Sequence, residues 1–121
     1  MQINGIEREF KLTVGAAAEI SELCPNGDLD RLQELLTDAS FGKTARIMAK
    51  IVVALNRGYQ DSLDPRTQTA DALTTREVLA LDLPEFQKVV DTAMKQMRAD
   101  QKGTVQITPK KNEGAADGTT L

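Results

Sequence analysis

The sequence predicts a mainly α-helical (α+β) domain in which an N-terminal β-hairpin packs on about five helices and a flexible C-terminal tail follows. This prediction depends on an Asn-Gly turn near the N-terminus, on apolar residues at helical spacing from residue 14 to about 100, and on a polar C-terminus. With 121 residues and 40% hydrophobic content, the chain can bury one compact core. We expect a single domain over residues 1–101, with the hairpin at 1–14, and a largely disordered polar tail at 102–121.

The predicted hairpin turns at Asn4 and Gly5, two residue types that accept the positive φ angles of a tight two-residue turn. After the turn, Phe10, Leu12 and Val14 alternate with polar residues, which predicts a strand with one apolar face. A two-stranded hairpin is marginally stable in water. We therefore expect it to pack on the helices or to add to the sheet of a neighbouring molecule.

Two short helices are predicted next. Thr13 can cap a first helix that runs to about Leu23, before Pro25-Asn26-Gly27 interrupts the pattern. Asp28 can cap a second helix that ends near residue 38, with leucines on one face and charged residues on the other.

The longest apolar pattern lies in a third helix, which Ser40 can cap and which we expect to end near Tyr59. Its seam repeats in steps of four and three residues through Phe41, Ala45, Met48, Val52, Leu55 and Tyr59. Further apolar residues widen this stripe, so we expect the helix to lie centrally with neighbours on two sides. Residues 60–73 lack a periodic apolar face and contain Asp64-Pro65, which predicts a loop.

The C-terminal part predicts two more helices. Thr74 and Glu77 form a capping box over a short helix that reaches Leu81, and Asp82 with Glu85 forms another box over a helix to about residue 100. The apolar side of this last helix contains Phe86, Val89, Val90, Ala93, Met94 and Met97. Residues 103–108 alternate like a short strand, which could pair with the hairpin or could order only on binding.

Composition favours binding or assembly over catalysis, because the chain has no histidine, one cysteine and no tryptophan. The absence of histidine removes the usual general base and the commonest metal ligand, so we expect no enzyme activity, metal or cofactor. The net charge of −3 argues against a nucleic-acid partner. The chain has no long apolar run and no basic-then-apolar leader, so we expect no membrane association and a cytoplasmic location, where Cys24 serves as apolar packing.

Three patterns could suggest chemistry, and each has a simpler explanation. Gly42-Lys43-Thr44 resembles the end of a phosphate-binding loop, but Thr37 stands where the first glycine should be, so we expect an ordinary helix start. Neighbouring carboxylates such as Asp28 and Asp30 fit helix caps. Residues 74–90 are similar to a helix-turn-helix, but acidic residues offset the cations of the second helix.

The N-terminal residues carry a family resemblance. Residues 3–15 read Ile-Asn-Gly-Ile-Glu-Arg-Glu-Phe-Lys-Leu-Thr-Val-Gly, and residues 17–23 read Ala-Ala-Glu-Ile-Ser-Glu-Leu. This opening resembles tail assembly chaperones of long-tailed bacteriophages, of the siphovirus type and including prophages. The resemblance continues as an order of elements to about residue 100, through Leu-Thr-Thr-Arg-Glu-Val-Leu at 73–79.

The resemblance implies a small, mostly helical protein that stays outside the virion. It implies that the protein binds the tape measure protein during tail assembly, keeps it soluble, helps to recruit tail-tube protein, and self-associates in the cytoplasm of the bacterial host. Members of this family are often also made in an extended form by ribosomal frameshifting. Codons for Lys110-Lys111-Asn112 can contain an A-rich slippery heptamer, so a frameshift site there is a hypothesis, and the alternative is an ordinary solvated polar tail.

For contact with a partner we expect hairpin residues and the methionines of the last helix, namely Ile3, Ile6, Phe10, Met94 and Met97. The alternatives are a small helix-turn-helix-like DNA-binding regulator and a general oligomeric adaptor. A basic stripe formed by Lys88, Lys95, Arg98 and Lys102 would favour the regulator. An exposed apolar groove, or an oligomer formed through the hairpin, would favour the chaperone.

Overall fold

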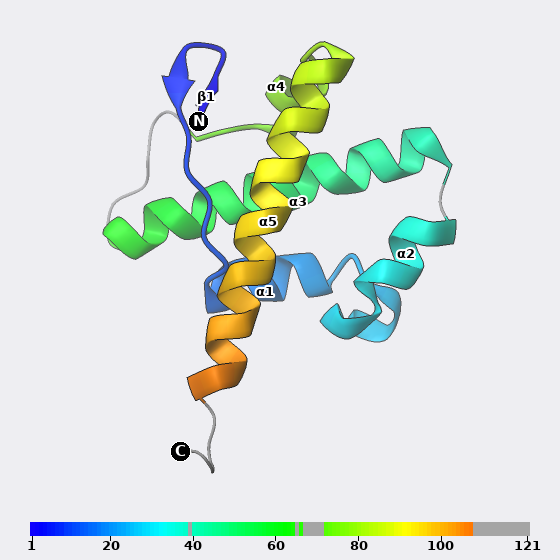
Figure 1. The fold of residues 1–121 in the computed structure, drawn as a ribbon, viewed down its shortest axis with the longest axis vertical. Helices are drawn as coiled ribbons and strands as arrows, with labels where there is room; N and C mark the ends of the chain where they lie inside the picture. The colour runs from blue at the N-terminus through cyan, green and yellow to red at the C-terminus, as the bar shows by residue number, and fades with distance from the viewer. Residues whose placement is uncertain (39, 65, 67–71, 108–121) are drawn as a thin grey trace.

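The computed structural model describes residues 1–38, 40–64, 66 and 72–107 (Figure 1). The described residues confirm the predicted fold class, a mainly helical protein with a small antiparallel N-terminal sheet and five α-helices. The order is β1 (Gln2–Ile3), β2 (Ile6–Glu7), α1 (Val14–Ser21), two 3₁₀ turns η1 (Pro25–Gly27) and η2 (Leu29–Arg31), α2 (Leu32–Asp38), α3 (Phe41–Leu63), α4 (Thr75–Leu79) and α5 (Leu83–Ile107).

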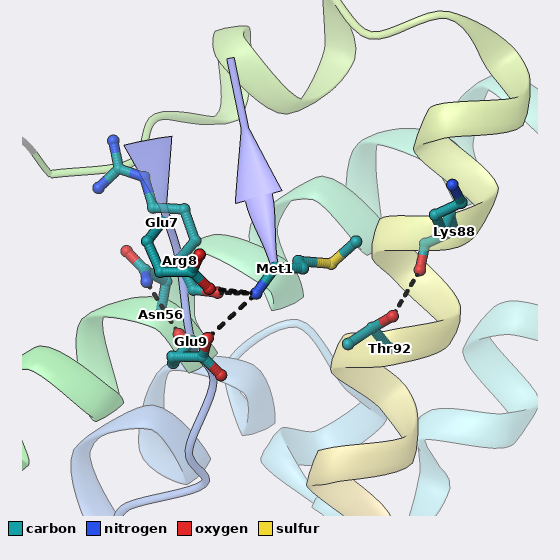
Figure 2. Close-up of polar contacts among 7 residues, drawn as sticks. All are labelled: Met1, Glu7, Arg8, Glu9, Asn56, Lys88 and Thr92. Atoms are coloured by element: carbon teal, nitrogen blue, oxygen red, sulfur yellow. Dashed lines mark hydrogen bonds and ion pairs between the residues drawn. The ribbon is translucent and has the colours of Figure 1, made fainter. Parts of the chain in front are cut away.

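The hairpin is confirmed but is shorter than expected. Asn4 and Gly5 have φ angles of 53° and 81°, as the tight turn requires, and Ile3 pairs with Ile6. The N-terminal ammonium of Met1 donates to Oε2 of Glu7 at 2.6 Å and to Oε2 of Glu9 at 3.0 Å (Figure 2). The two carboxylates raise the pKa of this ammonium, chiefly through the hydrogen bond to Glu7.

The predicted strand face of Phe10, Leu12 and Val14 is wrong. Residues 8–13 are extended. Arg8 N still donates to Met1 O of the hairpin at 2.7 Å, but from Glu9 to Leu12 the hydrogen bonds go to helices instead of a second strand. Lys11 N donates to Leu55 O at 3.0 Å, and Leu12 N donates to Oδ2 of Asp100 at 2.8 Å. Phe10 is buried, whereas Val14 is 89% exposed because it begins α1.

This extended segment lies between α3 and α5, where the dark blue chain runs beside α5 and crosses α3 (Figure 1). On the α3 side, the buried amide of Asn56 donates to Glu9 O at 2.9 Å (Figure 2). Two residues further along α3, a Cβ at Gly58 would overlap the carbonyl oxygen of Lys11 and lie 2.9 Å from Oγ1 of Thr13. A glycine is therefore what lets the segment approach α3 so closely.

The central position predicted for the third helix is confirmed, because α1, α4 and α5 all pack on α3. Its buried residues run from Ala49 through Ile51–Asn56 to Gly58. Two details of the prediction are wrong. Phe41 is 67% exposed, since the first turns of α3 extend beyond the core, and α3 continues to Leu63, so residues 60–63 are helical and not loop. The helix ends at Leu63, and Asp64 follows it as the C-cap. Asp64 precedes Pro65 in the sequence, and a proline disfavours helical geometry at the residue before it.

Local caps begin several helices where the sequence predicted them. The side chain of Thr13 accepts from Ala16 N, that of Ser40 accepts from Lys43 N, and that of Asp28 accepts from Asp30 N at the start of η2. The first helix ends at Ser21, slightly earlier than expected, because η1 turns the chain away. Thr74 forms the predicted capping box, but α4 ends at Leu79.

Helix α5 crosses α3 in Figure 1 and buries Val89, Ala93 and Met97. It is longer than predicted and ends at Ile107, so residues 103–107, whose alternation left a short strand open, are helical. Residues 108–121, with the hypothetical frameshift site at 110–112, lie outside the described residues. No helix in the described ranges combines the length and the apolar content that crossing a membrane requires.

Candidate partner-binding grooves

Helix α2 lies at the edge of the molecule, beside the N-terminal half of α3 (Figure 1). Its face toward the core consists of Leu32, which is buried, and Leu35 and Leu36, which are partly buried. This is the amphipathic pattern that the leucine spacing predicted. A groove opens on each side of α2, and these two grooves are the candidate functional site.

The groove between α2 and α3, which we call the basic groove, has a volume of about 600 Å³. Pro25, Leu35 and Ile47 provide its apolar surface. Its charged side chains are four cations and one carboxylate, namely Arg31, Lys43, Arg46, Lys50 and Glu34. The volume lies in the range of sites that bind small ligands or anchoring side chains of a partner.

The single acid of the basic groove is already paired. Arg31 donates to both carboxylate oxygens of Glu34, with nitrogen-to-oxygen distances of 2.9 and 3.1 Å. This bidentate contact lowers the pKa of Glu34 and raises the pKa of Arg31. Within the described residues, no carboxylate forms an ion pair with Lys43, Arg46 or Lys50. The groove therefore has a local positive charge in a chain whose net charge is negative.

One cation of α3 does form an ion pair with a carboxylate. Further along the helix, Nη1 of Arg57 lies 2.7 Å from Oε1 of Glu19 on α1. Arg57 and Lys50 both line a smaller cavity of about 240 Å³ between these two helices. The positive charge of α3 is thus neutralised toward its C-terminal half and stays unneutralised beside α2.

The second groove, which we call the methionine groove, lies between α2 and α5 and has a volume of about 260 Å³. Met94 and Met97 of α5 face three leucines of η2 and α2, and polar side chains surround them. Methionine adapts its shape to different apolar partners because it is unbranched and flexible. This groove can therefore accept an apolar side chain without a fixed shape requirement.

The five residues expected to contact a partner are not all accessible. Ile3, Phe10 and Met97 are buried in the core, so in this structure they pack the hairpin and α5 against α3. Ile6 is 38% exposed on the hairpin, and Met94 lies partly buried in the methionine groove. Partner binding by these residues stays a prediction, and burial limits it chiefly to Ile6 and Met94.

The patterns weighed for chemistry have structural roles here. Gly42-Lys43-Thr44 forms the first turn of α3 under the Ser40 cap. Cys24 is buried, and burial together with the nearby charge of Asp28 raises the pKa of its thiol. Within the described ranges, no group of three or more histidine, cysteine or acidic side chains could hold a metal ion.

The cations of the helix that is similar to a DNA-recognition helix have different surroundings. Lys88 lies 3.7 Å from the carboxylate of Glu85, and Arg98 lines the methionine groove. The side chain of Lys102 lies outside the described part of the structure. Lys95 and Arg98 are exposed, and no carboxylate of the described residues forms an ion pair with either of them. A second group of cations without ion pairs occurs on α3, a site that the sequence-based interpretation missed. The spacing of Lys43, Arg46 and Lys50 at i, i+3 and i+7 places them on one helix face and could have indicated it.

Comparison with known proteins identifies no relative. No family model, no curated protein and no solved structure matches this chain.

Proposed function

We propose that this protein acts without catalysis as a tail assembly chaperone of the kind made by long-tailed bacteriophages. In this role it binds the tape measure protein in the host cytoplasm, keeps it soluble and helps to recruit tail-tube subunits. The proposal is supported by the resemblance of residues 3–23 and by the order of the helices that follow. The observation that most favours it is the pair of open grooves beside α2, because both combine apolar surface with charged rims.

The physical argument concerns exposed apolar surface. A long helical protein that waits for its tube subunits exposes apolar stripes, and these associate unless another surface covers them. A chaperone that covers them must accept many similar segments, so a methionine-lined groove and a charged groove suit the task better than one rigid pocket. Self-association would place several such grooves along one client and would raise the avidity of binding.

The test is co-expression with any gene immediately downstream that encodes a long, tape-measure-like protein, followed by affinity purification of this protein. We expect the long protein to become soluble and to co-purify, and light scattering should show one defined complex. A matched culture that expresses the long protein alone is the control. If the long protein is equally soluble without this chain, or never co-purifies with it, the chaperone proposal is wrong.

A further inference from the structure

We infer that the basic groove is the docking site for an acidic, amphipathic helix of a partner protein. Its carboxylates pair with Lys43, Arg46 and Lys50, and an apolar side chain enters between Leu35 and Ile47. The inference builds on the proposed binding role, but it specifies the surface and the chemistry of the segment that binds there.

The spacing of the three cations matches a helical ligand. Lys43, Arg46 and Lys50 span roughly 10 Å along α3, given a rise of 1.5 Å per residue. A second helix laid along α3 presents side chains at the same i, i+3 and i+7 spacing, so three carboxylates can meet three cations at once. Ile47 lies on the same side of α3, and Leu35 faces it from α2, so the same helix can also bury one apolar anchor.

Charge supports an acidic occupant. All three cations are exposed, and none has an ion-pair partner among the described residues. Lys43 also lies in the first turn of α3, where the helix dipole disfavours a cation, and this turn contains no acidic residue. Folding therefore gains nothing electrostatic from a lysine at this position, whereas an approaching carboxylate would find both the lysine and the positive end of the helix.

A protein segment suits the groove better than nucleic acid does. Proteins that bind single strands stack bases on aromatic side chains, but the residues that line this groove include no aromatic side chain in the described part of the chain. Its surface between the cations is aliphatic instead. The net charge of −3 also repels a phosphate backbone that would extend beyond the groove.

The test uses the full-length protein and a fluorescein-labelled helical peptide about 16 residues long, a length at which an alanine-rich peptide begins to form helix. The peptide carries Glu at i, i+3 and i+7 beside one Leu, and a second peptide carries Gln in place of Glu. Fluorescence anisotropy measures binding at low and at physiological salt. We expect the Glu peptide to bind with a Kd roughly in the micromolar range, and the Gln peptide to bind at least about tenfold more weakly.

The decisive variant reverses the groove charges by Lys43→Glu, Arg46→Glu and Lys50→Glu. We expect it to weaken binding of the Glu peptide roughly tenfold or more, since three exposed ion pairs become repulsive contacts. The neutral variant with Gln at the same three positions should lose binding to a smaller extent, and it serves as the second test should the reversed variant fold poorly. Circular dichroism establishes that each variant remains helical.

The matched control carries Lys11→Glu, Lys88→Glu and Lys95→Glu, which give the same net charge but leave the groove intact. We expect it to bind the Glu peptide within about twofold of the unmodified protein. Equal loss in the control would mean that net charge and not the groove attracts the peptide, and it would overturn the inference. Unchanged binding by both groove variants would overturn it as well.

Two other occupants are distinguished by the same variants. If a labelled DNA duplex binds more tightly than the Glu peptide and the groove variant abolishes it, the groove is a nucleic-acid site and the inference is wrong. If the peptide does not bind but the groove variant changes the molar mass in light scattering, the groove holds a second copy of this chain.

The groove and the chaperone role can fail separately. If the groove variant still solubilises the long protein in co-expression and binds the Glu peptide like the unmodified protein, the docking site is wrong while the chaperone role stands. If the unmodified protein does not solubilise it but binds the Glu peptide in a groove-dependent manner, the chaperone role is wrong while the docking site stands.

Discussion

Replacing Gly58 by alanine should destabilise the protein, although alanine is normally the better helix former. In an exposed helix the change Gly→Ala gains about 1 kcal/mol. At Gly58 the new Cβ would overlap Lys11 O and lie 2.9 Å from Thr13 Oγ1 and 3.1 Å from the Cβ of Ala16. The segment must move away, which weakens the 3.0 Å hydrogen bond from Lys11 N to Leu55 O.

The magnitude follows from these opposing terms. Overpacking a filled site costs about 1–3 kcal/mol, and losing one backbone hydrogen bond costs about 1 kcal/mol. After subtraction of the gain in helix propensity, the free energy of unfolding should fall by about 1–3 kcal/mol. Urea denaturation followed by circular dichroism measures this change as a lower midpoint with an unchanged slope.

The matched control is Gly42→Ala in the first turn of the same helix, where a Cβ would meet only Nη1 of Arg46 at 3.7 Å. This variant should be unchanged or more stable by up to about 1 kcal/mol. If Gly58→Ala is as stable as Gly42→Ala, the close approach of the extended segment to α3 is wrong, and so is the topology that depends on it.

Three further predictions test other contacts. Asn56→Ala should cost about 1–3 kcal/mol in urea denaturation, because Glu9 O loses its buried donor. Thr74→Ala should cost about 0.5–2 kcal/mol and should speed amide hydrogen exchange in α4, since it removes the cap. The pKa of the Met1 ammonium should lie above 8.0, measured from the pH dependence of its acylation, and Glu7→Gln should lower it. The stabilisation from the raised pKa of the ammonium is therefore fully present below pH 8.0 and is lost as pH rises through that raised pKa. The stabilisation from the lowered pKa of Glu7 is present above about pH 4.5 and is lost as pH falls through that lowered pKa.

For each of these three predictions, one result would contradict the physical reason given. An Asn56→Ala variant as stable as the surface variant Asp61→Ala would mean that the Glu9 carbonyl finds water instead. Unchanged exchange in α4 after Thr74→Ala would show that tertiary packing alone holds this helix. An ammonium whose pKa does not respond to Glu7→Gln would mean that the hairpin contact is absent in solution.

Local signals predicted the elements well because they depend on neighbouring residues. The turn at Asn4-Gly5 and the caps at Thr13, Ser40 and Thr74 each act within about four positions of the chain. Errors occurred where local patterns compete with distant contacts. Residues 8–13 have a strand-like alternation, yet Leu55 and Asp100 supply hydrogen-bond partners that a second strand would otherwise provide.

The candidate site was harder to predict than the fold. The sequence places Lys43, Arg46 and Lys50 on one face of a helix, but their role depends on whether an acidic neighbour packs there. Glu34 pairs with Arg31 locally, at i and i+3, but only the placement of α2 shows that the three cations line an open groove. Conversely, Ile3, Phe10 and Met97 looked suited to a partner and are buried by other parts of the same chain.

By itself, the sequence determined the helical class, the hairpin turn and the helix starts, because these depend on backbone geometry and hydrogen bonds between residues close in the chain. Only the tertiary structure decided that residues 8–13 pass over Gly58, and that α2 leaves a basic groove on α3. Both depend on contacts between residues far apart in the chain, whose burial and charge pairing no single segment specifies.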